Sequence, residues 1–394
     1  MKPLPDILEI QPLTKPPECT ITVPGSKSIT NRALILAALS DKRCTLSGAL
    51  WAKDTQVMVD ALWELDFEVE VKADPVEECN RTITVVGRGG KIPAKKAELY
   101  VGNAGTAARF LTTLVCLGHG DYRISGDARM HERPMGDLFD ILRVLNVQIE
   151  SQGAHLPATI HANGLRQSAR VKASTQHSTQ FVSALLLISK VAPIEVELAA
   201  AGDPNGYIEM TRRMLEEFYP DYRIEPDLSG ASYFLAAEHL AGGKVDIADW
   251  PGNSLQVDGK FPQFLKSQPT EVSRSRNLGD SVMTLAMCAV FGDRPMTLVD
   301  ARRMREQECD RLHAMVTELQ RVGAKAEEHD DGFTVWPAEA GQLHGADIET
   351  YNDHRMAMCF AVLGLKVPGI RIKNPSCVSK TFPNFFEKLE QLRQ

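Results

Sequence analysis

Cationic and hydroxyl side chains gather in one segment near the N-terminus, residues 23–32, which reads VPGSKSITNR. The segment joins a short apolar strand, Thr20 to Val23, to an amphipathic pattern that predicts a helix. The first N–H groups of a helix have no backbone partner, and the helix dipole adds partial positive charge, so a helix start attracts anions. Because Lys27, Ser28 and Arg32 add two full charges and a hydroxyl, the segment predicts an anion-binding site.

Two other interpretations of this segment were weighed. A Walker phosphate loop requires glycine immediately before the lysine, and Ser26 stands there, so that loop is excluded. A helix that is merely capped by Ser26 or Ser28, with no ligand, remains the alternative.

Polar residues interrupt the apolar pattern at similar strand-to-helix junctions along the rest of the chain. The candidates are Asn103, Gly105 and Arg109, then Arg133, then Ser178, Thr179 and Gln180, then Asp280, Glu308, Arg311, His354, Arg355 and Lys380. Each could alone be an ordinary cap or surface charge. Together they place at least six cations and only two or three carboxylates in one expected cleft. The cations would repel one another while the cleft is empty. Since the planar guanidinium binds two oxygens at once, the set predicts polyanionic ligands that carry carboxylate or phosphate.

The composition excludes several classes of protein. The 394 residues carry a formal net charge of −7, which argues against nonspecific binding to nucleic acid or membrane. No apolar run approaches the roughly 18 residues of a membrane helix, and the proline-broken N-terminal stretch does not resemble a signal peptide, so we expect a cytoplasmic protein. The eight cysteines include no CxxC pair, so neither a metal site nor a redox pair is indicated, and Cys309 and Cys359 are the candidates for a reactive thiol.

Internal repetition predicts the architecture. A pattern of strand, polar loop and apolar helix occurs six times, with helices near Arg32, Arg109, Phe181, Tyr233, Val282 and Arg355. Most copies continue with a second helix and a hairpin such as the one at Asp331-Gly332, so we expect an α/β fold of the α+β type built from βαβαββ units.

Six units divide into two similar lobes of three, joined by a two-strand hinge with a cleft between the lobes. The expected bounds are residues 25–225 for the N-terminal lobe, and residues 1–24 with 226–394 for the C-terminal lobe. Two units lack a closing hairpin, after Phe218 and after Leu265. Either these hairpins are deleted, or the sequence lacks stretches that the protein contains. The sixth unit stops at its second helix, so we expect residues 7–22 to complete it from the other end of the chain.

The ordered motifs resemble the EPSP synthase (5-enolpyruvylshikimate-3-phosphate synthase) family. PGSKSxxxR, GNAGTAxR, RMxERP, SxQFxxALL, SASYFLAA, YNDHRMAM and KTFPxFF occur in the family's order from Pro24 to the C-terminus, with Gly230 in place of the first Ser of SASYFLAA. The resemblance implies the enolpyruvyl transferase inside-out barrel. It also implies transfer of the enolpyruvyl group of phosphoenolpyruvate to the 5-hydroxyl of shikimate 3-phosphate, in a monomer without metal or organic cofactor.

The resemblance also implies roles for the candidates. The residues matching shikimate 3-phosphate contacts are Lys27, Ser28, Arg32, Ser178, Thr179, Gln180, Tyr207, Asp280 and Gln307. Those matching phosphoenolpyruvate contacts are Lys27, Gly105, Arg133, Gln180, Arg311, Arg355 and Lys380. Asp280 and Glu308 match the acid/base carboxylates, and Lys27 and Lys380 complete the implied catalytic set. The family is the target of glyphosate, and Gly105, in place of a bulkier residue, suggests a sensitive protein.

Some positions depart from the family pattern. Gln307 replaces the usual lysine, Arg303 replaces an asparagine, and Pro204 replaces a phosphate-binding serine. A positive charge could have moved from position 307 to Arg303 or Arg305. Two rival functions remain open: the related transferase that acts on UDP-N-acetylglucosamine, which the SKS and YNDHR motifs disfavour, and an inactive anion-binding relative, which the two short units favour.

Overall fold

The computed structural model describes residues 3–165, 168–199 and 205–394. The chain divides into two compact units, which are named unit 1 (residues 1–24 and 226–394) and unit 2 (residues 25–225). Pro204, one of the departures noted above, lies outside the described residues. Each unit is described by itself.

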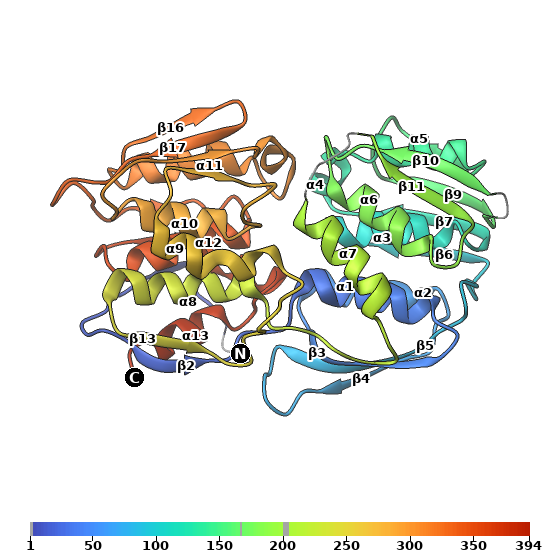
Figure 1. Ribbon diagram of the computed structural model, residues 1–394, viewed down its shortest axis with the longest axis horizontal. Coiled ribbons are helices and arrows are strands. Elements are labelled where there is room, and N and C mark those ends of the chain that lie inside the picture. Colours follow the sequence, from blue (N-terminus) through green and yellow to red (C-terminus); the bar gives the residue numbers. More distant parts are fainter. Residues whose placement is uncertain (1–2, 166–167, 200–204) are drawn as a thin grey trace. The chain divides into compact units, whose positions relative to one another are not determined.

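Unit 2 contains three sheets around buried helices (Figure 1). Its strands are β3 (Arg43–Leu50), β4 (Val69–Ala73), β5 (Asn80–Val86), β6 (Lys96–Tyr100), β7 (His119–Ser125), β8 (Gln148–Ser151), β9 (Ala158–Asn163), β10 (Ala169–Ala173), β11 (Ile194–Leu198) and β12 (Asp221–Arg223). The sheet orders are β12-β3-β5-β4, β6-β7-β9-β8 and β10-β11. Its helices are α1 (Lys27–Leu39), α2 (Lys53–Glu64), α3 (Gly105–Val115), α4 (Ala128–Glu132), α5 (Gly136–Val144), α6 (Thr179–Ile188) and α7 (Gly206–Glu217).

Unit 1 repeats this plan. Its strands are β1 (Ile7–Glu9), β2 (Glu18–Ile21), β13 (Lys244–Ile247), β14 (Glu271–Ser273), β15 (Met296–Val299), β16 (Ala326–His329), β17 (Gly332–Val335), β18 (Asp347–Ile348) and β19 (Arg371–Lys373). The sheet orders are β13-β2, β14-β15-β17-β16 and β1-β19-β18. Its helices are α8 (Leu228–Ala241), α9 (Phe261–Ser267), α10 (Val282–Ala289), α11 (Arg311–Arg321), α12 (His354–Gly364) and α13 (Phe385–Gln391), with 3-10 turns η1 (Val257–Lys260), η2 (Arg302–Glu306) and η3 (Pro375–Lys380).

Burial separates two kinds of helix. Every residue of α3 and of α12 is buried, whereas α5 and α7 bury one face only. A helix that is apolar all round must be enclosed by other elements, and an amphipathic one can face solvent on its polar side. The fully apolar runs that the repeats share therefore become inner helices whose polar first turns are the functional candidates.

In each complete repeat, the second strand pairs with the hairpin that closes the repeat. In the first repeat β3 pairs in parallel with β12 and antiparallel with β5, which continues to β4. The strands β11 and β13 hold the same place in the third and fourth repeats, and each forms a two-stranded sheet instead. The chain passes from α7 to β12 through residues 218–220 and from α9 to β14 through residues 268–270, so both hairpins that the sequence lacks are missing from the fold.

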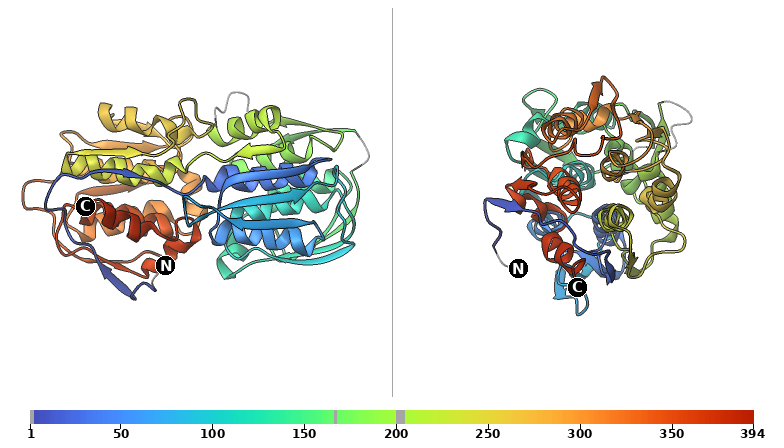
Figure 2. Two further views of the ribbon diagram at one scale, coloured as in Figure 1. Left: turned by 90° about the horizontal axis from the view of Figure 1, so that it is seen from below. Right: turned by 90° about the vertical axis from the view of Figure 1, so that its left-hand side faces the viewer.

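The N-terminal segment is divided between two sheets, as the two views of Figure 2 allow the reader to follow. The strand β1 pairs antiparallel with β19, so it completes the sixth repeat as expected. The strand β2 instead pairs in parallel with β13 of the fourth repeat, so the expectation that residues 7–22 all belong to the sixth repeat is wrong in that part. The α/β fold class predicted from the repeats is confirmed.

Candidate functional site

The first turn of α1 in unit 2 begins without a side-chain cap. Ser26 is the N-cap residue, but its side chain forms no capping hydrogen bond, so the expected serine cap is absent. By contrast, Ser178 caps α6 and Asn205 caps α7 through their side chains. The loop before α1 is fixed by Gly25, whose N–H donates to Asn80 Oδ1 at 2.8 Å. The first N–H groups of α1 therefore have no capping hydrogen bond to the side chain of the N-cap residue.

Lys27 and Arg32 lie in different surroundings. Lys27 Nζ is 3.2 Å from Asp54 Oδ2, and its side chain is 15 % exposed. The guanidinium of Arg32 is buried and donates to Thr211 Oγ1 at 2.7 Å and Ser183 Oγ at 3.0 Å. Burial lowers the pKa of Arg32 to about 10, which leaves it charged at neutral pH. Arg32 therefore ties α1 to α6 and α7, while Lys27 is the more accessible cation.

The carbonyl oxygens of two first-turn residues also accept from Arg32. Its Nη1 donates to the Ser28 oxygen at 2.9 Å and its Nη2 to the Tyr207 oxygen at 3.2 Å. The Ser28 and Tyr207 first turns are thereby held against one buried cation, which brings two of the predicted contacts together.

The glycine of the NAGT motif leaves room for two arginines. A Cβ at Gly105 would lie 2.5 Å from Arg133 Nη2 and 2.7 Å from Arg109 Nη1. Arg133 Nη1 donates to Asn103 Oδ1 at 3.0 Å, and Arg109 Nη2 donates to the Pro134 oxygen at 2.7 Å. The first turn of α3 therefore holds Arg109 and Arg133 side by side.

The first turn of α6 contacts α3. Ser178 Oγ accepts from Gln180 N at 3.1 Å, and Gln180 Nε2 donates to Thr106 Oγ1 at 3.1 Å. Thr179 is the first residue of α6 and is partly exposed. Gln180 thereby links the two motifs that the resemblance assigns to different substrates.

In unit 1, Arg311 is the centre of a buried ion-pair network. Its Nε lies 2.7 Å from Asp353 Oδ2, its Nη2 lies 2.9 Å from Glu308 Oε2, and its Nη1 donates to Gln307 Oε1 at 2.7 Å. The side chain is 1 % exposed. The three carboxylates around it, which include Asp280, outweigh the effect of burial and hold the pKa of Arg311 well above its ordinary value.

Asp280 receives three guanidinium groups from three different elements. Its Oδ1 lies 2.6 Å from Arg274 Nη2 and 3.6 Å from Arg311 Nη1, and its Oδ2 lies 2.7 Å from Arg355 Nη2. Arg355 Nη1 also donates to the buried Tyr233 hydroxyl at 3.3 Å. Asp280 is therefore a mostly buried carboxylate in a fixed orientation.

A buried carboxylate holds the loop that carries Asp280. Asp258 accepts from the backbone N–H of Gly279 at 2.5 Å and from the Ser281 hydroxyl at 2.7 Å. The Ser229 hydroxyl at the start of α8 donates to the same carboxylate. The residues on both sides of Asp280 are thus anchored to one buried side chain.

Glu308 and Lys380 face each other on the other side of Arg311. Lys380 Nζ lies 3.8 Å from Glu308 Oε1, and the two side chains are 11 % and 7 % exposed. His354 is completely buried. Its Nδ1 lies 3.5 Å from Asp353 Oδ1, so it contacts the ion-pair network through Asp353. The structure therefore brings together all the unit 1 candidates, in one cluster of charged side chains.

The arginines of unit 1 are paired with carboxylates. Arg274, Arg311 and Arg355 each lie beside Asp280, Glu308 or Asp353, so the expected repulsion between cations is offset in this cluster. Of the two residues suggested to replace the charge at position 307, Arg305 is instead paired elsewhere, because its Nη1 lies 2.6 Å from Glu328 and 2.9 Å from Asp310. Arg303 is the other candidate.

The two candidate thiols lie in surroundings that keep them protonated. Burial, and then the charge of Asp353, raise the pKa of Cys309 well above its ordinary value. Burial raises the pKa of Cys359 to about 12. These surroundings favour inert thiols over the alternative of a reactive Cys309 or Cys359.

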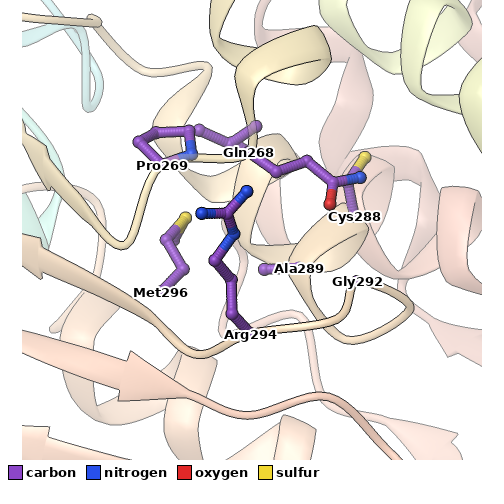
Figure 3. A pocket seen from close by; sticks show the side chains of 8 residues that line it. Gln268, Pro269, Cys288, Ala289, Gly292, Arg294 and Met296 are labelled. Atoms are coloured by element: carbon purple, nitrogen blue, oxygen red, sulfur yellow. The ribbon is translucent and has the colours of Figure 1, made fainter.

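A separate cavity lies beside the junction of α9 and β14, where the closing hairpin of the fourth repeat is missing (Figure 3). Gln268, Pro269, Cys288, Arg294 and Met296 are among the side chains that line it. Its volume is about 20 Å³, which is room for one water molecule and no substrate. The cavity contains none of the predicted site residues.

Sequence reasoning missed several partners of the site residues. Asp54, Asn80, Ser183 and Thr211 support the candidates of unit 2, and Arg274 contacts Asp280 in unit 1. Only Arg274 had a signal in the sequence, because the run SRSR directly follows the short strand expected at Thr270 to Val272. Among the described residues, no group of three or more His, Cys, Asp or Glu side chains could hold a metal ion, and no helix is long and apolar enough to cross a membrane.

Solved structures share this fold. An EPSP synthase from Acinetobacter baumannii aligns with a TM-score of 0.75 and 22 % identity over 98 % of both chains. Curated relatives are closer in sequence. The 3-phosphoshikimate 1-carboxyvinyltransferase of Nostoc punctiforme is 36 % identical over 98 % of this chain and 99 % of the relative, and that of Opitutus terrae is 37 % identical over 100 % and 99 %.

The alignments also bear on the short repeats. The alignment with the Nostoc relative spans 431 positions against 394 residues in this chain, so at least 37 positions have no counterpart here. The profile of the family described as EPSP synthase (3-phosphoshikimate 1-carboxyvinyltransferase) matches residues 13–221 and 219–389. The two matched segments meet where α7 runs into β12, at the first missing hairpin. With nearly its whole length matched, this chain belongs to the EPSP synthase family.

Proposed function

We propose that the protein transfers the enolpyruvyl group of phosphoenolpyruvate to the 5-hydroxyl of shikimate 3-phosphate and releases phosphate. The observation that carries the proposal is the buried cluster of unit 1, where Asp280 and Glu308 share Arg311 at 3.6 Å and 2.9 Å. Enolpyruvyl transfer needs one group that takes a proton from the hydroxyl and one that protonates the methylene carbon. Two carboxylates on either side of one arginine, both of low exposure, suit that division.

In this proposal Asp280 accepts the proton of the 5-hydroxyl. Glu308 or Lys380 delivers a proton to the methylene carbon, and the two form an ion pair at 3.8 Å. The product of addition is a tetrahedral intermediate. The group that protonated the methylene carbon then takes a proton back from the resulting methyl group as phosphate leaves, which restores the double bond. Arginines held in place by neighbouring carboxylates stabilise the leaving phosphate without having to reorganise.

The substrate contacts are divided between the units. Lys27, Ser28, Arg32, Ser178, Thr179 and Tyr207 of unit 2, with Asp280 and Gln307 of unit 1, are proposed for shikimate 3-phosphate. Gly105, Arg133, Gln180, Arg311, Arg355 and Lys380, with Lys27, are proposed for phosphoenolpyruvate. The uncapped start of α1 supports the first assignment, because its N–H groups suit phosphate oxygens. We further propose a monomer that acts in the cytoplasm and is inhibited by glyphosate.

A coupled phosphate-release assay tests the reaction. Purified protein with phosphoenolpyruvate should release phosphate only after shikimate 3-phosphate is added, and UDP-N-acetylglucosamine should not replace it. Equal turnover with UDP-N-acetylglucosamine would assign the protein to the related transferase instead.

The two missing hairpins support a second candidate, an inactive relative that binds anions. It predicts that calorimetry detects shikimate 3-phosphate binding while no phosphate is released. Binding and phosphate release measured on the same preparation therefore distinguish the active transferase from the inactive relative.

A further inference from the structure

Arg274 directly follows β14, in a turn that is held at both ends. Its N–H donates to the Val299 oxygen of β15 at 2.9 Å, which continues the sheet by one residue. The side chain of Asn277 closes the turn, because its Oδ1 accepts from Ser273 N at 2.8 Å. Arg274 is therefore placed by a sheet rather than by a loose loop.

The side chain of Arg274 is directed at Asp280. Its Nη2 lies 2.6 Å from Asp280 Oδ1, and the two side chains are 10 % and 13 % exposed. Arg355 holds the other carboxylate oxygen at 2.7 Å. Because Arg274 and Arg355 hold different oxygens, the plane of the carboxylate is fixed.

The charge balance of the cluster depends on Arg274. Arg274, Arg311, Arg355 and Lys380 face Asp280, Glu308 and Asp353, which leaves one positive charge. Gln307 contacts Arg311 Nη1 at 2.7 Å and brings no charge. Without Arg274 these side chains would carry no net charge.

We propose that Arg274 is a positioning residue for Asp280. The inference rests on the proposed function, because the proton that Asp280 accepts there belongs to the substrate hydroxyl. Arg274 orients the acceptor and does not itself exchange a proton.

Steady-state kinetics of Arg274 variants test the proposal. Arg274→Gln should lower kcat about tenfold or more with the KM of phosphoenolpyruvate within about threefold, since a misoriented base slows the proton transfer. Arg274→Lys should recover part of the loss. Arg276→Gln is the matched control, because Arg276 lies two residues away with a side chain that is 57 % exposed, and it should stay within about twofold of the parent.

The conservative variant distinguishes positioning from mere folding. An Arg274→Gln enzyme with unchanged kcat, a loss confined to KM, or no recovery with Arg274→Lys would each overturn the proposal.

The assay of the parent protein distinguishes failure of this proposal from failure of the proposed function. No phosphate release by the parent would refute that function whatever the variants do. The pairing of Arg274 with Asp280 is then measured by a double-mutant cycle of Arg274→Gln and Asp280→Asn in guanidinium unfolding. Non-additive shifts of the unfolding midpoint support the pairing, and additive shifts overturn it.

Discussion

Gly105 is the glycine at which an added side chain would meet two arginines of the candidate site. An added Cβ would meet the ends of Arg109 and Arg133 at 2.7 Å and 2.5 Å, and both are flexible side chains that can move aside. Gly105→Ala should therefore leave the thermal midpoint within a few degrees but raise the KM of phosphoenolpyruvate and weaken glyphosate binding. Circular dichroism melting and inhibition assays measure the two effects. Unchanged KM would place the arginines of the α3 start outside the site.

The two acid/base candidates should respond differently from the anion-binding arginines. Glu308→Gln and Asp280→Asn each remove a charge and a proton acceptor with little change in shape. Each should lower kcat by about 100-fold or more with smaller effects on substrate binding. Arg133→Ala should mainly raise the KM of phosphoenolpyruvate. Normal kcat in both carboxylate variants would exclude them from proton transfer.

The buried thiols give a prediction that is independent of activity. Because burial raises the pKa of Cys309 and of Cys359, neither should react with iodoacetamide at neutral pH in the folded protein. In guanidinium all eight cysteines should be alkylated, which intact mass spectrometry counts. Rapid alkylation of Cys309 in the folded state would contradict the shielding described here.

At the residue scale, sequence reasoning found the cations better than their partners. Arg311 and Arg355 stand in motifs, so their importance could be predicted. Their pairing with Asp280 and Asp353 brings together residues from separate repeats, and no local pattern reports such contacts. The pairing of the unit 1 arginines with carboxylates could not be predicted for that reason.

At the scale of elements, the repeats could be predicted from the sequence because inner helices are apolar all round and begin with polar turns. The pairing of β2 could not be predicted from the sequence. The strands β1 and β2 are both short, and only the three-dimensional course of the chain assigns them to different sheets. The same holds for Asp258, which belongs to η1 but anchors the loop before α10.

Asp258→Asn tests how far that anchor matters. The amide has one acceptor oxygen where the carboxylate has two, so a buried N–H or hydroxyl loses its partner, at a cost of about 1–3 kcal/mol. The variant should unfold at lower denaturant concentration and show reduced kcat, because the loop carries Asp280. Asp246→Asn, at a side chain that is 58 % exposed, is the matched control and should change neither. A stable Asp258→Asn enzyme with full activity would show that the loop needs no anchor.

At the scale of the whole molecule, the proposed contacts lie in two compact units, each with inner helices of its own. The first turns that are proposed for shikimate 3-phosphate belong mainly to α1, α6 and α7 of unit 2, and the proton-transfer cluster belongs to unit 1. A ligand that binds before the other should therefore leave a signature in one unit first. If binding of one substrate favours binding of the other, the reverse must hold by the same factor.

Hydrogen exchange with mass spectrometry can locate that signature. Shikimate 3-phosphate alone should slow amide exchange in the first turns of α1, α6 and α7, because bound phosphate oxygens accept from those N–H groups and oppose local opening. Adding glyphosate should extend protection to peptides that contain Glu308 to Arg311 and Asp353 to Arg355. Inorganic phosphate at the same ionic strength is the control and should protect far less. Protection by shikimate 3-phosphate that is confined to unit 1 would contradict the assignment, because the uncapped start of α1 would then have no part in holding the first substrate.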